Sequence, residues 1–198
     1  MRFYRKNRKF YLLCLLLAAV GIVAGILFAA KGGLSRIKKT GVFSNYYLHE
    51  YAYLTIDRAA LFWIVAKERG KWFFLLWAAG MTGAGIWLSG FFPVLWGFFA
   101  SVFFAQALLK QGLSGLALAL LFQMPQALIY LPLFLWSLYQ AAKKSAQIRT
   151  QKKTGAVQVE HRTYMRCFVT AFGILLLGIL TESYGNSFLV QLILRIFY

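Results

Sequence analysis

The stretch WFFLLWAAGMTGAGIWLSGFFPVLWGFFASVFFAQALL, residues 72–109, runs for 38 residues without a charged side chain. As one helix it would rise about 57 Å at about 1.5 Å per residue, nearly twice the roughly 30 Å of bilayer hydrocarbon. The run must therefore fold back on itself inside a membrane. Glycine and proline occur together in SGFFP, residues 89–93, which predicts a turn between two spans at about 72–88 and 92–109.

The composition of the whole chain is also that of a membrane protein. Of its 198 residues, 61% are hydrophobic, and the formal net charge is +17. A soluble domain of this size could not cover so much apolar surface. A strongly basic chain can bind nucleic acid, but here the basic residues cluster between apolar runs, as the positive-inside rule and anionic headgroups require. We therefore expect a bilayer with anionic headgroups as a partner, and no nucleic acid.

Three further apolar runs complete the predicted architecture. They cover about 10–30, 113–139 and 167–181. The fold class is then an all-α, polytopic membrane helix bundle with about five transmembrane helices, forming a single membrane domain over residues 1–198. The tail, 187–198, is too short to cross a bilayer and is expected to form a short C-terminal half-helix.

The first apolar run, residues 10–30, follows the basic sequence MRFYRKNRK, as the apolar centre of a signal peptide would. Signal-peptide centres are about 7–15 residues long and end at an A-x-A-like site, whereas this run is longer and lacks that signature. We therefore expect an uncleaved span with its N-terminus in the cytoplasm. Gly21 and Gly25 form a G-x-x-x-G pair that would let another helix approach closely, although glycine is also common in spans by chance.

Two polar segments separate the spans. The interval 31–71 has a net charge of +5, and Asp57 within it can cap a helix that is either interfacial or the start of the next span. The basic segment 140–166 predicts an exposed cytoplasmic loop. Four crossings would precede that loop, so it lies on the side of the N-terminus, as the positive-inside rule asks. The interval 31–71 would then face outward, against the rule at its Lys31 and Lys71. This topology predicts a multi-pass protein of the bacterial cytoplasmic membrane.

Glutamine and proline residues interrupt the predicted fourth span. Pro125 and Pro132 each remove a backbone donor, and the carbonyls left free in lipid need new partners. Gln123 and Gln126 flank Pro125, and Gln106 lies on the preceding span. Amides that face lipid would stay unpaired, so we expect this segment to face protein. The residues either join the helices or line a substrate path, as in transporters; the spans lack the Asp, Lys or Arg that would drive coupled transport.

A second polar group, Glu182, Tyr184 and Asn186, stands at the end of the last span. Glu182 is either hydrated or paired at the interface, or it belongs to a polar break that touches a partner. A catalytic use would need a second titrating group close by, and the sequence has no catalytic triad, paired carboxylates or phosphate loop. We therefore expect no enzyme activity, no catalytic residues and no cofactor.

The cysteines and histidines do not suggest a metal site. Cys14 and Cys167 lie in or beside apolar runs and behave as small hydrophobic residues. His49 and His161 stand apart from any thiol or acidic cluster at ligand spacing. We expect no bound metal.

Several motifs, in order along the chain, resemble the stage II sporulation protein M family. They are GVFSNYYLHEY at 41–51, the glycine turn Lys110-Gln111-Gly112 leading into LALLFQMPQALIYLPLF, and GILTESYGN at 178–186. The second is similar to a Leu-Pro-Gln and Tyr-x-Pro pattern, with Met124 in place of the leucine. The third is similar to a Gly-x-x-x-Glu-x-Tyr-x-Asn ending, with Ser187 where the family often has proline.

This resemblance implies a function that composition cannot supply. Members are multi-span scaffolds that hold two cell-wall hydrolases, the stage II sporulation proteins D and P, at the septal membrane during engulfment. We expect partner contacts at the polar break 182–186 and within 41–58, where the candidate residues are Phe43, Tyr46, Tyr47 and Glu50. The alternative function is a small permease or transport-type membrane subunit, which predicts a water-accessible cavity lined by Gln106, Gln123 and Gln126.

Overall fold

The computed structural model describes residues 2–33, 43–154 and 161–197. Within those ranges every regular element is helical, which confirms the predicted all-α class. The elements in chain order are α1 (Arg2–Phe28), the π-helical turn η1 (Ala29–Gly33), α3 (Asn45–Tyr53), α4 (Arg58–Gly80), α5 (Gly85–Gln123), α6 (Gln126–Thr154), α7 (His161–Leu180), the π-helical segment η2 (Thr181–Asn186) and α8 (Ser187–Phe197).

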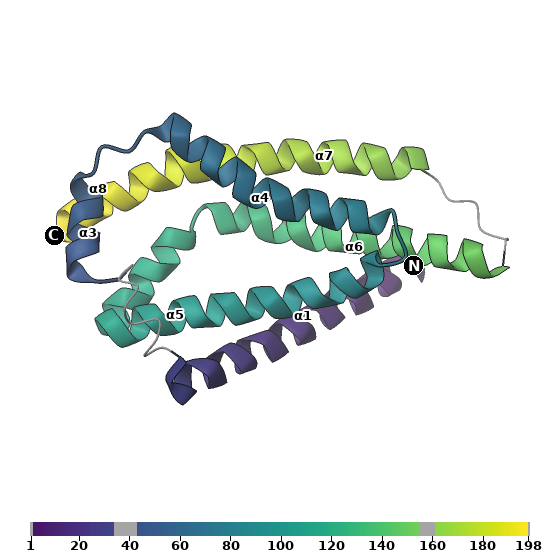
Figure 1. Ribbon diagram of the computed structural model, residues 1–198, viewed down its shortest axis with the longest axis horizontal. Helices are drawn as coiled ribbons and strands as arrows, with labels where there is room; N and C mark the ends of the chain where they lie inside the picture. The colour runs from purple at the N-terminus through teal and green to yellow at the C-terminus, as the bar shows by residue number, and fades with distance from the viewer. Residues whose placement is uncertain (1, 34–42, 155–160, 198) are drawn as a thin grey trace.

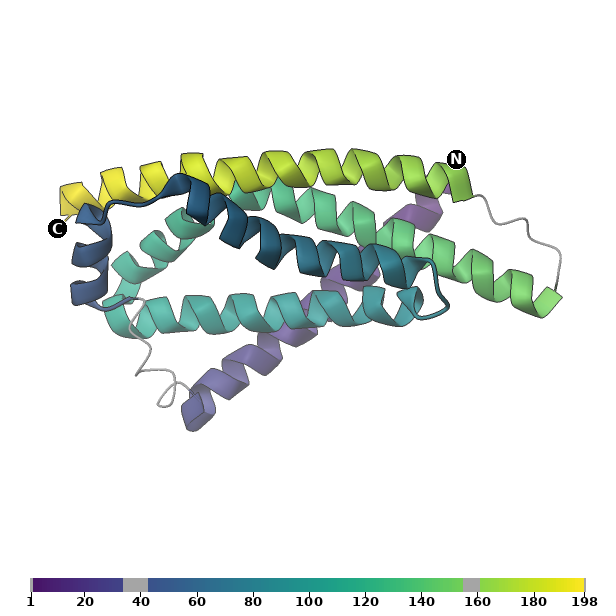
Figure 2. The same ribbon diagram turned by 45° about the horizontal axis from the view of Figure 1, so that its top comes forward.

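The chain forms an elongated bundle in which α4, α5, α6 and α7 run lengthwise beside one another (Figure 1). Helix α1 crosses α5 obliquely on one side of the bundle (Figure 2). The N-terminus, the turn after α4 and the start of α7 lie at one end, and α3 and the C-terminus lie at the other. We call these the basic end and the α3 end. The basic end takes its name from the cationic residues described there: Arg8, Lys9, Lys143, Lys144, Arg149, Lys152, Arg162 and Arg166.

Among the residues that the structure describes, three helical stretches are long and apolar enough to cross a membrane. They are Arg8–Lys31, Gly85–Gln123 and His161–Arg195. The protein is therefore a membrane helix bundle. Helices α4 and α6 lie beside these stretches but carry more polar side chains, among them four charged residues between 67 and 71 on α4.

The turn between α4 and α5 is not where the sequence predicted it. It lies at residues 81–84, and α5 continues as a helix through the predicted turn at 89–93. The hydroxyl of Thr82 closes the observed turn, because it donates to the carbonyl of Ala79 (2.8 Å) and accepts from the amide of Ala84 (3.2 Å). Pro93 is buried inside α5, where surrounding helices compensate for a lost backbone bond.

Close packing against α1 explains the glycines of α5. A Cβ on Gly97 would overlap the carbonyl oxygen of Ala18, and a Cβ on Gly21 would overlap that of Val94. Gly25 is equally close to α5. These small residues let the two backbones touch, which confirms the close approach predicted for the G-x-x-x-G pair.

The basic segment after the fourth predicted span is helical for most of its length, so the expected exposed loop over 140–166 is wrong. Helix α6 extends to Thr154, and α7 begins at His161. Lys144 lies inside the bundle at 2% exposure, with its amine 5.7 Å from the ring centre of Tyr164. The long apolar stem of lysine and the ring beneath its amine make this burial possible.

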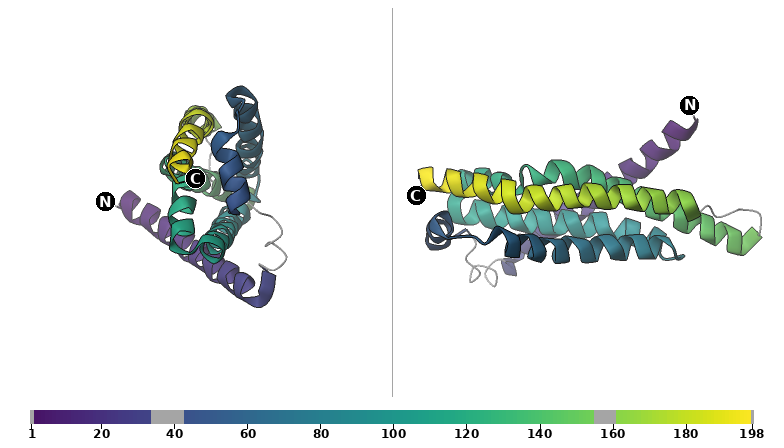
Figure 3. Two further views of the ribbon diagram at one scale, coloured as in Figure 1. Left: turned by 90° about the vertical axis from the view of Figure 1, so that its left-hand side faces the viewer. Right: turned by 90° about the horizontal axis from the view of Figure 1, so that it is seen from above.

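The predicted boundaries at Asp57 and at residues 182–186 do not separate helices as expected. Asp57 caps α4 as expected, accepting from the amides of Ala59 (2.9 Å) and Ala60 (3.2 Å), and a single helix then runs to Gly80 without a separate interfacial piece. The predicted break over residues 182–186 is η2, through which α7 and α8 continue as one long rod (Figure 3). A π-helical segment absorbs the irregularity without ending the helix.

Aromatic and aliphatic side chains of α4, α6 and α7 form the main core. Phe73 and Trp77 of α4 pack against Phe168 of α7, with ring centres 5.6 and 5.4 Å apart. The hydroxyl of Tyr164 donates to the carbonyl of Trp77 at 2.8 Å. This core fixes the relative height of the three helices, and so positions the polar residues described next.

Candidate functional site

A partly buried ion pair joins α4 to η2. Arg69 donates from Nε to Oε2 of Glu182 at 3.2 Å and from Nη2 to Oε1 at 2.7 Å. The side chain of Glu182 is 16% exposed and that of Arg69 is 42% exposed. Two parallel bonds between a guanidinium and a carboxylate make a strong and directional contact. Of the roles predicted for Glu182, the structure supports pairing with a basic residue.

Tyr130 of α6 completes the contact. Its buried ring lies beneath the guanidinium of Arg69, at 5.1 Å from the ring centre. Gly178 of α7 lies against the same ring, because a Cβ there would overlap it. Cation–π attraction and close packing thus bring α4, α6 and α7 together at one point.

Two amides meet at the break between α5 and α6. The carbonyl of Phe122, which precedes the cis Met124–Pro125 bond, accepts from Nε2 of Gln126 at 2.8 Å and from Nδ2 of Asn186 at 2.9 Å. A carbonyl released by a helix break needs such partners in an apolar setting. The predicted role of Gln126 is therefore confirmed, and Asn186 adds the second donor. We call Arg69, Phe122, Gln126, Tyr130, Glu182 and Asn186 the polar junction.

The polar junction has spare hydrogen-bonding capacity. Four buried atoms in or beside the junction have no hydrogen-bond partner in the part of the chain that the structure describes. They are Gln126 Oε1, Tyr130 OH and Asn186 Oδ1 of the junction, and Oγ of the neighbouring Ser183. All four lie on η2 or near the start of α6. Such atoms are uncommon in a stable core, and four of them lie together here.

The second candidate region is α3, which lies across the end of the bundle where the C-terminus lies (Figure 1). Leu48 and Ala52 are buried against Val190 and Leu194 of α8. The opposite face carries exposed aromatic residues and one exposed acid. They are Tyr46 (72% exposed), Tyr47 (54%), Tyr53 (56%) and Glu50, and we call them the α3 platform.

Side-chain hydrogen bonds from other helices hold α3 in place. Gln191 of α8 donates to the carbonyls of Tyr51 (3.2 Å) and Leu54 (2.8 Å). Arg195 donates from Nε to the carbonyl of Ala52 at 2.9 Å. Burial raises the pKa of Tyr51, so its hydroxyl stays protonated. The platform is thus presented on a fixed helix.

Gln111 of α5 fixes the start of the α3 segment. It donates to the carbonyl of Phe43 at 3.1 Å and to Oδ1 of Asn45 at 2.6 Å. Ser44 caps the helix by accepting from the amide of Tyr47 at 3.4 Å. Gln111 and Ser44 thus hold the N-terminal end of α3, while Gln191 and Arg195 hold its C-terminal end.

The remaining predicted residues are distributed between the interior and the surface. Phe43 is fully buried against Phe103 and Ala107, so it packs inside the protein and offers no surface to a partner. Pro132 is exposed, so the expectation that it faces protein is wrong. Its face of α6 points outward while Gln126 and Tyr130 point inward.

Four more residues have intermediate or mixed positions. Gln106, Gln123 and Pro125 are half-buried, and Tyr184 is exposed beside the polar junction. The sequence did not identify Arg69 as the partner of Glu182, since 113 positions separate the two. It also missed Gln191 and Arg195, which look like ordinary polar positions on an apolar helix.

The α3 platform and all of the polar junction except Asn186 belong to a segment that resembles a known family. A family model described as Stage II sporulation protein M matches residues 14–185, which include α3 and the Arg69–Glu182 pair. No curated protein and no solved structure matches the chain.

Proposed function

This chain belongs to the stage II sporulation protein M family, and from that premise we propose that it is a membrane scaffold that recruits and holds peptidoglycan-degrading enzymes during sporulation engulfment. The enzymes resemble the stage II sporulation proteins D and P, and the location is the septal membrane of the mother cell. The family supports a role in sporulation, and the long apolar helices support residence in a membrane.

The observation that carries the proposal is the α3 platform. Exposed tyrosines on a helix held by hydrogen bonds form a preorganised surface, and tyrosine is enriched at protein–protein contacts. The platform lies at the end of the bundle opposite the basic end. If the positive-inside rule places the basic end in the cytoplasm, the platform faces the cell wall, where the hydrolases work.

We place five crossings in the bilayer: α1, α4, α5, α6 and the rod formed by α7 and η2. Their support is the three stretches of sufficient length and hydropathy, together with the parallel course of α4 and α6. An odd number of crossings puts the two ends of the chain on opposite sides, in agreement with their positions at opposite ends of the bundle (Figure 1). On α4, the exposed ion pair of Glu68 and Lys71, 2.6 Å apart, lowers the cost of the charges.

The polar junction has a supporting role in this proposal. Its hydrogen bonds tie η2 to α4 and α5, and α8 continues directly from η2 to carry α3. The platform is thereby linked to the membrane bundle through hydrogen-bonded contacts. A scaffold needs this kind of fixed geometry to present two enzymes to the wall.

The test is co-purification of both hydrolases with the full-length chain from membranes that contain all three proteins. We expect Tyr46→Ala/Tyr47→Ala/Tyr53→Ala to lower the recovery of at least one hydrolase by about tenfold, since tyrosine truncations at an interface centre each cost about 1 kcal/mol or more. The matched control is Trp87→Ala/Phe99→Ala, which removes equally exposed aromatic residues of α5. Unchanged recovery of both enzymes with the tyrosine variant contradicts the proposal.

The alternative, a transport-type subunit, receives less support. It predicts a cavity lined by Gln106, Gln123 and Gln126, but Gln126 is bonded to the carbonyl of Phe122 inside the helix break. A large cavity exists, and none of the three glutamines lines it. Solute uptake into proteoliposomes above the level of empty vesicles would favour the alternative.

A further inference from the structure

Helix α4 presents a charged stripe on an uncovered face of the bundle. Its members recur at alternating spacings of four and three positions, and all of them are exposed: Ala60, Ile64, Lys67, Lys71, Phe74 and Ala78. Helix α4 lies at the front of the bundle in Figure 2, and no described helix lies over it. The spacing puts these side chains on one helix face and is the spacing by which one helix packs along another. We call them the α4 stripe.

The two lysines of the α4 stripe lie at the centre of the helix. Lys67 is nine residues from the first residue, Arg58, and Lys71 is nine residues from the last, Gly80. The helix rises about 35 Å, close to the roughly 30 Å of bilayer hydrocarbon. With α4 as a crossing, each lysine is about 14 Å or more from both ends of the helix. Lysines near the end of a span can reach the interface with their stems, whereas these two lie deep in the hydrocarbon.

Only part of the charge at the centre of α4 is neutralised within the chain. Arg69 is paired with Glu182, and Lys71 is paired with Glu68 at 2.6 Å. Among the described residues, no acidic side chain forms an ion pair with Lys67. Ionisable groups inside a membrane are costly, and they normally face protein, an opposite charge or water. The α4 stripe therefore carries one positive charge in excess.

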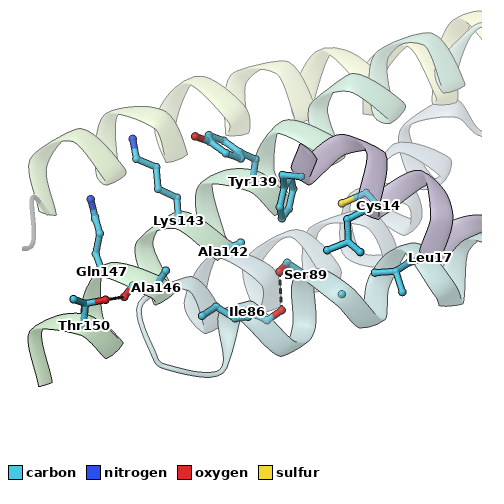
Figure 4. A pocket seen from close by; sticks show the side chains of 13 residues that line it. Cys14, Leu17, Ile86, Ser89, Tyr139, Ala142, Lys143, Ala146, Gln147 and Thr150 are labelled. Carbon is cyan, nitrogen blue, oxygen red and sulfur yellow. Dashed lines mark hydrogen bonds between the residues drawn. The ribbon is translucent and has the colours of Figure 1, made fainter. Parts of the chain in front are cut away.

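The large cavity of the protein does not hydrate Lys67. This cavity of about 830 Å³ lies between α1, α5 and α6, where Leu17, Ile86 and Ala142 are among the residues that line it (Figure 4). No residue of α4 contributes to its walls. The excess charge therefore needs a partner from outside the chain.

A second copy of the chain does not fit the α4 stripe. Two copies in one membrane have the same orientation, so a two-fold pair of α4 helices would bring each lysine of the stripe against its own counterpart. Like charges in a medium of low dielectric constant repel strongly. An acidic side chain on a different helix is attracted to the same position. The charge of the stripe thus selects an unlike partner.

We propose that the α4 stripe packs against a transmembrane helix of another protein, and that this helix carries an Asp or Glu at mid-depth that pairs with Lys67. Ile64 (61% exposed) and Phe74 (50% exposed) supply apolar contacts on either side of the charge. Ala60 and Ala78 let the partner helix approach closely at the ends of the stripe. The inference rests on the crossing of α4 that belongs to the proposed function, but it does not depend on the α3 platform.

The experiment uses designed transmembrane peptides of one apolar sequence that differ only at the central residue, which is Asp, Asn or Leu. Each peptide is reconstituted into vesicles with the full-length protein, and energy transfer between labels on the two measures their association. We expect the Asp peptide to associate about tenfold more tightly than the Leu peptide, the scale of a polar contact between membrane helices. Lys67→Leu should abolish this preference without lowering the unfolding temperature. Lys31→Leu, at an exposed lysine outside α4, is the matched control and should keep it.

The premise that α4 crosses the bilayer is tested separately. With Cys14 and Cys167 replaced by serine, Lys67→Cys should react with a water-soluble maleimide at least about tenfold more slowly than Tyr46→Cys, because thiol labelling needs water at the site. The reaction is carried out in membranes made permeable to the reagent. Fast labelling of Lys67→Cys would place α4 outside the bilayer and overturn both the five crossings and the inference.

Three other results overturn the inference alone. They are equal association of the Asp and Asn peptides, an Asp preference that survives Lys67→Leu, and a disulfide between two copies of an Ile64→Cys variant. The variant Tyr46→Ala/Tyr47→Ala/Tyr53→Ala should keep the Asp preference, because the α3 platform lies on another element. Loss of hydrolase recovery and loss of peptide association therefore report on different surfaces.

Discussion

Arg69 and Glu182 stand 113 residues apart in the chain and form two hydrogen bonds of 3.2 and 2.7 Å. This pair links α4 to η2, and the ring of Tyr130 packs beneath it. Because Glu182 is mostly withdrawn from solvent, loss of Arg69 leaves its carboxylate without compensation in a poorly hydrated place.

Replacement of one member of the pair should destabilise the bundle. We expect Arg69→Leu to lower the free energy of unfolding by about 1–3 kcal/mol, less than for a fully buried pair because Arg69 is partly exposed. The measurement is thermal unfolding in detergent, followed by circular dichroism. Lys71→Leu, which breaks the exposed pair with Glu68 on the same helix, is the control and should leave the unfolding temperature nearly unchanged. Equal effects of the two variants contradict this account.

The two amides on the carbonyl of Phe122 should behave as a coupled set. Gln126→Leu and Asn186→Leu each remove one donor, and each is expected to cost about 1 kcal/mol. Together they leave that carbonyl without a side-chain donor, so the double variant should lose more than the sum of the single losses. A double-mutant cycle by thermal unfolding measures the coupling. Strict additivity would show that the shared acceptor has no energetic consequence.

Glycine at the crossing of α1 and α5 should resist enlargement. A side chain at Gly97 would overlap the backbone of Ala18, so Gly97→Val should cost about 2–3 kcal/mol or drive the helices apart. The control is Gly173→Val, at an α7 position where nothing lies within 4 Å of an added Cβ. Unfolding temperature and limited proteolysis of α1 report the difference.

Helix α3 should loosen when its anchors are removed. Arg195→Ala/Gln191→Ala eliminates three hydrogen bonds to the backbone of α3 and the residue that follows it. We expect amide hydrogen exchange across residues 45–54 to accelerate by about tenfold or more, while α4 and α6 stay unchanged. Leu192→Ala, at an exposed position on the same helix, should leave exchange in α3 unaltered.

The orientation of the bundle can be tested in intact cells. Tyr46→Cys at the α3 end should react with a membrane-impermeant maleimide added outside, whereas Thr82→Cys in the turn at the basic end should react only after the cells are opened. The free thiols Cys14 and Cys167, which are buried and half-buried, are first replaced by serine. Labelling of Thr82→Cys from outside would reverse the proposed topology.

Long-range hydropathy was enough to predict a helical membrane bundle. An uncharged run of 38 residues cannot be one span, and only helices satisfy backbone groups in hydrocarbon without pairing to distant chain segments. The helix cap at Asp57, the close approach at Gly21 and the turn at Gly112, where φ is +62°, were also predictable from the sequence. Each depends on residues that are near in sequence or on one helix face.

The position of the turn between α4 and α5 could not be predicted from local sequence. The SGFFP segment has stronger turn composition than MTGA, residues 81–84, yet Gly90 and Pro93 belong to a helix. Close packing against α1 uses the glycines of α5, so tertiary contact outweighs local preference there. The same holds for Lys144, whose burial depends on the ring of Tyr164 from another helix.

Local chemistry along the chain thus accounts for the helices, their apolar faces and the family motifs. Three-dimensional packing decided which distant polar groups meet: Arg69 with Glu182, and Asn186 with the carbonyl of Phe122. The reason is physical. Helix formation follows from bonds within four residues, whereas a side-chain partner a hundred positions away depends on how several rigid helices settle against one another, and no short-range pattern encodes that arrangement.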